Sequence, residues 1–74
     1  MNIGKAFRKI REDNKIGQRE MSRIIGVTPA TLWKIESGKC WPKPQTIKNF
    51  SKAMHVPVAM VYIDGIEPDD YLVL

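Results

Sequence analysis

The sequence GQREMSRIIGVTPATLWKIESGK, from Gly17 to Lys39, predicts two short helices joined by a glycine turn. Gly26 stands where the first helix needs a left-handed residue to end, a conformation that glycine adopts without a Cβ clash. Thr28 is suited to cap the second helix, and Pro29 to occupy its first position, where the missing N–H has no consequence. We expect Gly38 to end this second helix.

A helix, a short glycine-containing turn and a second helix form the geometry that lets the second helix enter the DNA major groove, although a plain helical hairpin shows the same pattern. The expected inward faces are apolar, with Met21, Ile24 and Ile25 on the first helix and Leu32 and Ile35 on the second. The outward face of the second helix combines hydroxyl, small and basic side chains with a single acid. This polarity favours DNA recognition over a purely structural hairpin.

Length and composition limit the chain to one small domain. Its 74 residues are near the lower size at which a hydrophobic core stabilises a fold without disulfides or metals. The single cysteine, Cys40, excludes an internal disulfide and offers no metal cluster. No apolar run approaches the roughly 20 residues that cross a bilayer, and the charged start MNIGKAFRKIRE is unlike a signal peptide. We therefore expect a cytoplasmic protein without a membrane partner.

Charge is distributed unevenly along the chain. Residues 1–63 hold all twelve Lys and Arg side chains but only four acids, a formal charge of +8, whereas residues 64–74 hold four acids and no base. A basic body of this kind attracts polyanions, of which nucleic acid is the commonest. A solvated surface with excess lysine is the simpler alternative.

The rest of the sequence predicts three more helices. Apolar residues recur at helical spacing from Ile3 to about Asn14 and again from Pro44 to Met54, and a short apolar helix is expected from about Val58 to Ile63. The two prolines within Lys39 to Pro44 make that segment a loop. We therefore expect an all-α, compact five-helix domain over residues 1–64.

From about Ile3 to Asp64 the chain resembles the phage-repressor/Cro (XRE-like) helix-turn-helix family. The matching sequence features are specific in combination, although none of them is specific alone. These features are Arg11 late in the first helix, Gln18 opening the second, a proline before the fourth, and the segments Gly26-Val27-Thr28, Ile35-Glu36-Ser37-Gly38 and Ala53-Met54-His55-Val56. The resemblance implies a five-helix, repressor-like DNA-binding fold that acts as a homodimer on a two-fold symmetric operator. It further implies a sequence-specific transcriptional regulator, most often a repressor, of bacterial or phage origin.

The resemblance also implies roles for individual residues. Gln18 matches a position that holds a DNA phosphate at a helix start, where free N–H groups and the helix dipole favour an anion; an ordinary solvated glutamine is the alternative. Arg11 and Glu36 match a partly buried structural ion pair between the first and third helices. With the neighbouring basic and hydroxyl side chains added, the phosphate-contact candidates are Gln18, Arg19, Thr28, Ser37, Lys39 and Lys43.

Base reading is expected from the first two turns of the third helix, at Pro29, Ala30, Thr31, Trp33 and Lys34. The chain departs here from the family pattern, which usually has polar side chains at the positions of Pro29 and Ala30. Those two can only contact a thymine methyl group, whereas Lys34 can donate to guanine. Because few polar side chains are placed to hydrogen-bond to the bases, we expect DNA shape to contribute to sequence preference. Trp33 either lies on sugars and phosphates or packs onto Trp41.

The last helix and the tail carry more apolar surface than a core of this size needs. Val58 and Val61 are expected to seal the core, and the excess then marks a partner surface. A homodimer is the natural partner, because two-fold symmetry places two recognition helices one turn of DNA apart. Alternatively, the tail, residues 65–74, folds back and completes the monomer core. The dimer-interface candidates are Met60, Tyr62, Ile63, Ile66, Tyr71, Leu72, Val73 and Leu74.

Two other classes of function are alternatives to a DNA-binding regulator. An enzyme is disfavoured, because His55 is the only histidine, Cys40 has no partner base and no glycine-rich phosphate loop is present. We therefore expect no catalytic residue, metal or cofactor. The stronger alternative is a protein-interaction module, such as an antitoxin or antirepressor whose apolar C-terminal surface masks a second protein.

Overall fold

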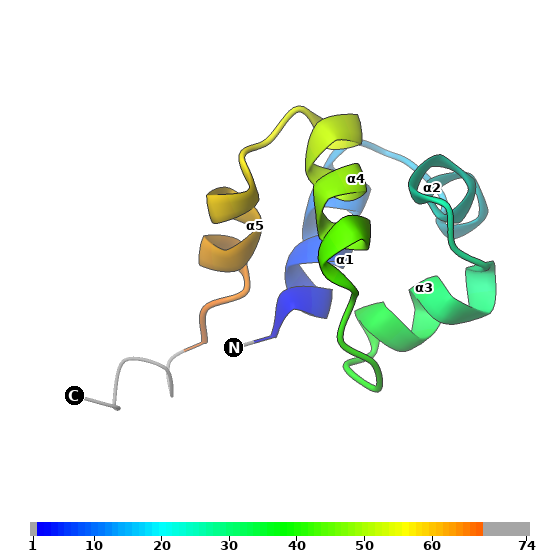
Figure 1. Ribbon diagram of the computed structural model, residues 1–74, viewed down its shortest axis with the longest axis horizontal. Coiled ribbons are helices and arrows are strands. Elements are labelled where there is room, and N and C mark those ends of the chain that lie inside the picture. The colour runs from blue at the N-terminus through cyan, green and yellow to red at the C-terminus, as the bar shows by residue number, and fades with distance from the viewer. Residues whose placement is uncertain (1, 68–74) are drawn as a thin grey trace.

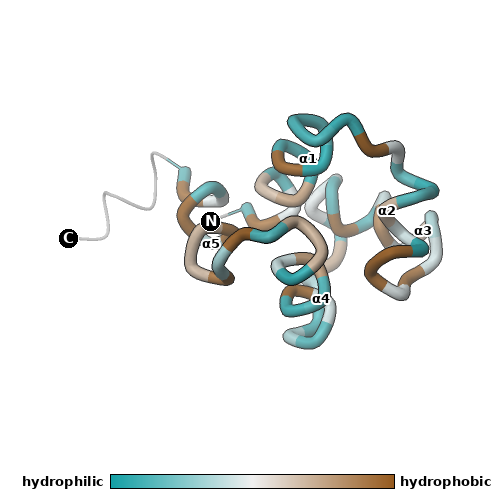
Figure 2. Tube along the Cα trace, turned by 90° about the horizontal axis from the view of Figure 1, so that it is seen from above, coloured by the Kyte–Doolittle hydropathy of each residue, from teal (hydrophilic) through white to brown (hydrophobic). Residues whose placement is uncertain are grey.

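The computed structural model describes residues 2–67, which fold into five α-helices, as the sequence predicts. The helices are α1 (Ile3–Asp13), α2 (Gln18–Ile25), α3 (Pro29–Glu36), α4 (Pro44–Met54) and α5 (Val58–Asp64). In Figure 1, α1 and α4 lie in the middle, α2 and α3 at one end and α5 at the other. The view from above shows the same arrangement (Figure 2). Within residues 2–67, no helix has the length and apolar character that a membrane span requires.

The turn between α2 and α3 has the predicted backbone. Gly26 ends α2 in the left-handed region at φ 78°, and Val27 follows with its N–H donated to the Ser22 carbonyl at 2.9 Å. The Thr28 side chain caps α3 by accepting from the Thr31 N–H at 3.1 Å, and Pro29 is the first residue of the helix. These bonds satisfy donors and acceptors that a helix end otherwise leaves without a partner.

The hydrophobic core lies between the helices and contains side chains from all five. Phe7 of α1 and Phe50 of α4 stack at its centre, with ring centroids 4.1 Å apart and planes inclined by 11°. The buried apolar residues are Ile3, Ala6, Phe7, Ile10, Met21, Ile25, Leu32, Ile35, Ile47, Phe50 and Val61. Within residues 2–67 all five helices therefore share one core.

Two apolar residues that the sequence places inside are exposed. Ile24 lies on the outer side of α2, because Met21 and Ile25 are directed inward together with Ser22. Val58 lies on the surface, and Val61 alone of the two valines is buried. The expectation that both valines seal the core is therefore wrong, because Val61 lies in the core and Val58 does not.

Glycine permits a close contact between α1 and α3. A Cβ added at Gly4 would collide with the Ile35 carbonyl oxygen, so the backbones of the two helices touch at this point. At the same end of α1, the Asn2 N–H donates to the Gly65 carbonyl at 2.7 Å, which ties the start of α1 to the end of α5. α1 thus holds α3 on one side and α5 on another.

Candidate nucleic-acid interface

The outward side of α3 presents the residues that the sequence predicts for base contact. Leu32 and Ile35 are fully buried and fix the inward side of the helix. On the other side Pro29, Ala30 and Lys34 are exposed. One helical turn separates Ala30 from Lys34, so these side chains are neighbours on one face. The exposed side of α3 therefore begins with two apolar residues, Pro29 and Ala30, and continues with the cation of Lys34.

The start of α3 is held by a pair of threonine hydroxyls. The Thr28 hydroxyl donates to Thr31 Oγ1 at 2.9 Å while its oxygen accepts from the Thr31 N–H. Thr31 is half-buried, and Thr28 is exposed. The Thr31 hydroxyl keeps its own hydrogen available to donate to DNA, because in this pair it accepts.

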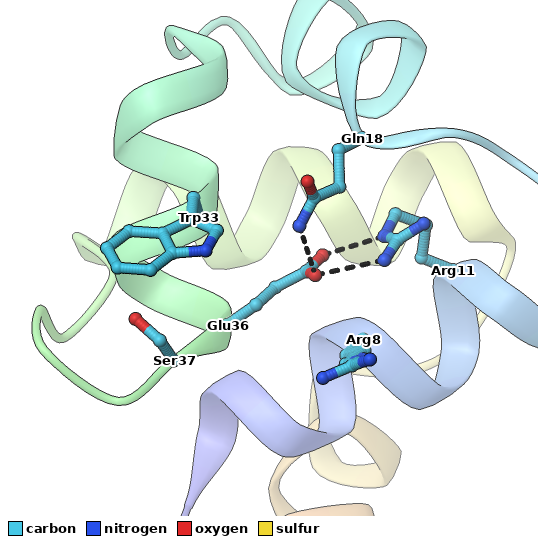
Figure 3. A pocket seen from close by; sticks show the side chains of 6 residues that line it. All are labelled: Arg8, Arg11, Gln18, Trp33, Glu36 and Ser37. Atoms are coloured by element: carbon cyan, nitrogen blue, oxygen red, sulfur yellow. Dashed lines mark hydrogen bonds and ion pairs between the residues drawn. The ribbon is translucent and has the colours of Figure 1, made fainter.

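A buried polar cluster joins α1, α2 and α3 (Figure 3). Arg11 donates from Nε to Glu36 Oε2 at 2.7 Å and from Nη2 to Glu36 Oε1 at 3.0 Å, which is the expected ion pair. Its third bond, from Nη1, reaches the Ile16 carbonyl at 2.8 Å. The hydrogen bonds that Arg11 donates to Glu36 raise the pKa of Arg11; burial opposes this rise, and the nearby charges of Glu36 and Glu12 add to it.

Gln18 belongs to the same cluster, a contact that the sequence did not reveal. Its Nε2 donates to Glu36 Oε1 at 3.0 Å, so the side chain of this predicted phosphate ligand is oriented by Glu36 (Figure 3). An amide nitrogen carries two hydrogens, and the second is not used in this bond. Gln18 is the first residue of α2 and lies where that helix has free N–H groups.

Trp33 lies beside this cluster rather than against Trp41. The Lys39 ammonium sits 4.6 Å from the centroid of the Trp33 ring, a cation–π contact. Trp33 also borders a hollow lined by Arg8, Arg11, Gln18, Glu36 and Ser37. Trp41 lines two other hollows, and residues 2–67 show no stacking between the two indoles. Packing of Trp33 onto Trp41, one of the two expectations, is therefore not found.

The remaining phosphate-contact candidates come from several segments that surround α3. Arg19 is exposed at the start of α2, and Ser37 and Lys39 at the end of α3. The Ser37 hydroxyl donates to the Lys34 carbonyl at 3.2 Å. Lys43 is exposed at the start of α4. The structure thus places two of these cations beside α3, since Lys39 lies over Trp33 and Lys43 lines a hollow together with Thr28 and Thr31.

The predicted dimer residues lie at the opposite end of the molecule or outside the described part of the chain. Met60 and Ile63 are exposed on α5, whereas Tyr62 is half-buried and packs against the core. Ile66 is half-buried as well. Residues 71–74, Tyr71, Leu72, Val73 and Leu74, lie outside the described residues. Both views place α5 away from α3 (Figures 1 and 2).

Comparison with known proteins gives consistent matches. A family model for a helix-turn-helix domain matches residues 4–72. The HTH-type transcriptional repressor RghR of Bacillus subtilis (strain 168) is 35% identical over 57 residues, which is 76% of this chain and 42% of the relative. The uncharacterized HTH-type transcriptional regulator RghRB of the same organism is 36% identical over 56 residues, or 74% of this chain and 40% of the relative. The chain thus spans about two fifths of these relatives.

Solved structures agree with the fold. The crystal structure of the clp gene regulator ClgR from Corynebacterium glutamicum matches with a TM-score of 0.82 at 26% sequence identity, over 86% of this chain and 68% of that chain. A second ClgR structure matches with a TM-score of 0.80, over 83% of its chain. The match of the family model over most of the chain, together with these relatives, shows that the chain belongs to the helix-turn-helix domain family.

Proposed function

We propose that this chain is a sequence-specific, DNA-binding transcriptional regulator, most simply a repressor, that inserts α3 into the major groove. The observation that carries the proposal is the exposed side of α3, where Pro29, Ala30 and Lys34 project from a helix whose other side is buried. A helix with its diameter of roughly 10–12 Å fits a major groove roughly 12 Å wide. In such a complex Lys34 donates to guanine, and Pro29 and Ala30 contact thymine methyl groups.

The charge distribution supports the same proposal. Residues 1–63 carry a formal charge of +8, and the exposed cations include Arg19 at the start of α2 and Lys39 and Lys43 beside α3. Contacts between cations and phosphates supply most of the sequence-independent part of DNA affinity. Gln18 and the backbone at the start of α2 are suited to a further phosphate, because helix starts carry free donors. Thr28 and Ser37 are the hydroxyl candidates for the same backbone.

The known relatives support a regulator rather than an enzyme. RghR is named a transcriptional repressor and ClgR a gene regulator. Among residues 2–67, no group of three His, Cys, Asp or Glu side chains is placed to hold a metal. We propose that the chain acts in the cytoplasm of a bacterium or as a phage product.

We further propose that the chain acts as a homodimer on a two-fold symmetric operator. Met60 and Ile63 leave an exposed apolar face on α5, at the end of the molecule opposite the helix-turn-helix unit. A homodimer bound to such an operator places its two copies of α3 in half-sites about 34–36 Å apart on one side of the duplex.

Selection of bound duplexes from a random pool tests this function. We expect enrichment of a two-fold symmetric site whose half-sites are about 10 base pairs apart, together with steep weakening of binding by salt. Recovery of no preferred site, or affinity that does not depend on salt, would contradict the proposal.

The same exposed face on α5 favours a second candidate, a protein-interaction module such as an antitoxin or antirepressor. Met60 and Ile63 are exposed there and lie one turn apart on the helix. In that case the partner is a second protein rather than a second copy. Size-exclusion chromatography of the pure protein separates the two candidates, because a homodimer has twice the mass of the chain without any added partner.

A further inference from the structure

We propose that the hollow between α1, α2 and α3 seats one backbone phosphate of DNA, and that Arg8 is its ionic ligand. The inference rests on the DNA-binding function proposed above and adds a residue that the sequence pattern did not single out. The hollow has a volume of about 420 Å³ and is lined by Arg8, Arg11, Gln18, Trp33, Glu36 and Ser37 (Figure 3). One water molecule occupies about 30 Å³ in the liquid, so the space admits a phosphate group.

The position of the hollow suits a phosphate that flanks α3. Trp33 and Ser37 belong to the same side of the α3 segment, one turn apart, and both line the hollow. A helix nearly fills the width of the major groove, so the phosphates of one strand must run along its flank. Arg8 of α1 and Gln18 of α2 border the hollow on the sides away from α3 (Figure 3).

The charges of the hollow leave one cation for an anion. Glu36 is neutralised by two hydrogen bonds from Arg11 and is further bound by Gln18, so its carboxylate is already occupied. Arg8 has only a loose pairing, from Nε to Glu12 Oε2 at 3.4 Å, with both side chains more than half exposed. Exposed pairs of this kind contribute little stability. Arg8 can therefore leave Glu12 and bind a phosphate with little loss of free energy.

The donors around the hollow match the chemistry of a phosphate. A guanidinium donates two parallel hydrogen bonds to phosphate oxygens, which fixes both distance and orientation. The second Nε2 hydrogen of Gln18 adds a donor whose direction is set by Glu36. The exposed indole of Trp33 forms an apolar wall on which the adjoining sugar can lie. The cation thus comes from Arg8 of α1, the oriented donor from Gln18 of α2, and the flat apolar surface from Trp33 of α3.

Lys9 provides a matched control for Arg8. It is the next residue of α1, its side chain is 60% exposed against 63% for Arg8, and it forms the same kind of pair with Asp13 at 3.8 Å. Lys9 does not line the hollow. Arg8→Gln and Lys9→Gln therefore remove equal charge from neighbouring exposed positions. Only Arg8→Gln removes a cation that lines the hollow.

The test compares both variants with the unaltered chain on a duplex of about 20 base pairs recovered by selection. We expect Arg8→Gln to reduce the slope of log affinity against log salt by about 0.9 for each bound copy of the chain, the value for one phosphate contact, and Lys9→Gln to change it much less. Replacing single phosphates of the duplex by neutral methylphosphonates should weaken the unaltered chain at every contacted phosphate, of which one in each half-site lies in the hollow. At that position Arg8→Gln should show no further weakening.

Equal slopes for Arg8→Gln and Lys9→Gln, or additive losses at every methylphosphonate position, would overturn the assignment of Arg8. Either result would leave the DNA-binding function intact, because the unaltered chain still binds. Failure of the unaltered chain to bind any selected duplex would instead refute the function itself.

Discussion

The Arg11 guanidinium lies against the Glu36 carboxylate with two hydrogen bonds, 2.7 Å from Nε and 3.0 Å from Nη2, across 25 positions of sequence. The side chains are 9% and 4% exposed, so the pair is shielded from water. It joins α1 to the last residue of α3 and, through Gln18, to the first residue of α2. The three helices that border the proposed DNA-binding face therefore share one buried charge pair.

Loss of one charge from this pair should destabilise the fold. Glu36→Gln leaves the buried Arg11 charge without a counterion, and we expect the free energy of unfolding to fall by about 3–5 kcal/mol. Urea unfolding measures the change. The control is Glu12→Gln, which removes the carboxylate of an exposed pair and should change stability by no more than about 1 kcal/mol. Similar losses for the two variants would show that burial does not distinguish the pairs.

The contact between α1 and α3 predicts a strong effect at Gly4. A methyl group there meets the Ile35 carbonyl oxygen, so we expect Gly4→Ala to reduce stability by about 1–3 kcal/mol, the usual range for overpacking. Gly17→Ala is the control, because nothing lies within 4 Å of its added Cβ. Thermal unfolding of both variants measures the difference. A Gly4→Ala protein as stable as Gly17→Ala would contradict the close approach of the helices.

Lys34 should determine part of the base preference. We expect Lys34→Ala to lower the discrimination between the selected site and single-base variants by about 1–3 kcal/mol at one base pair. Competition binding measures this loss. The control is Lys48→Ala, an exposed lysine of α4. If Lys34→Ala weakened all duplexes equally, Lys34 would be a phosphate ligand instead of a base reader.

The exposed face of α5 should hold the dimer. Met60→Lys places a charge on this face, and we expect the mass in sedimentation to shift toward the monomer. Ile24→Lys is a matched control at the other end of the molecule, since Ile24 is 43% exposed and Met60 42%. We expect it to leave the mass unchanged. Equal masses for the two variants would exclude a dimer through α5.

The fluorescence of Trp33 should change when DNA binds, whereas that of Trp41 should not. Trp41→Phe leaves Trp33 as the only tryptophan, because the chain has two. Binding should shift its fluorescence to shorter wavelength, since the exposed indole moves from water against sugars and phosphates. Trp33→Phe, which leaves Trp41, is the control. A larger shift in that variant would place Trp41, and not Trp33, against the duplex.

Local chemistry was enough to predict the helix-turn-helix unit. Glycine at position 26 and the Thr28-Pro29 pair act on their own backbone, so their effect can be read without knowledge of the surrounding fold. The ion pair of Arg11 and Glu36 followed from the resemblance to a known family, not from spacing. The exposed row on α3 followed from the periodicity of Leu32 and Ile35.

Contacts between helices could not be predicted in the same way. A stripe of apolar residues does not fix how far a helix is rotated against its neighbours, which is why Ile24 and Val58 were expected to be buried and are exposed. The hydrogen bond from Gln18 to Glu36 and the position of Arg8 at the same hollow as Trp33 depend on the same packing angles. Gly4 carries no sequence signal for its role, since its importance comes only from the Ile35 carbonyl opposite it.

The touching backbones of α1 and α3 have a consequence for how an operator is recognised. With Gly4 against the Ile35 carbonyl no side chain separates the two backbones at this point, so we expect α3 to keep its position against α1 instead of shifting to follow an irregular groove. Adaptation on complex formation must then come from the nucleic acid, which bends or changes its groove width to meet an unyielding protein surface. Flexible base steps, at positions that no side chain reaches, should accordingly be enriched in the preferred sites.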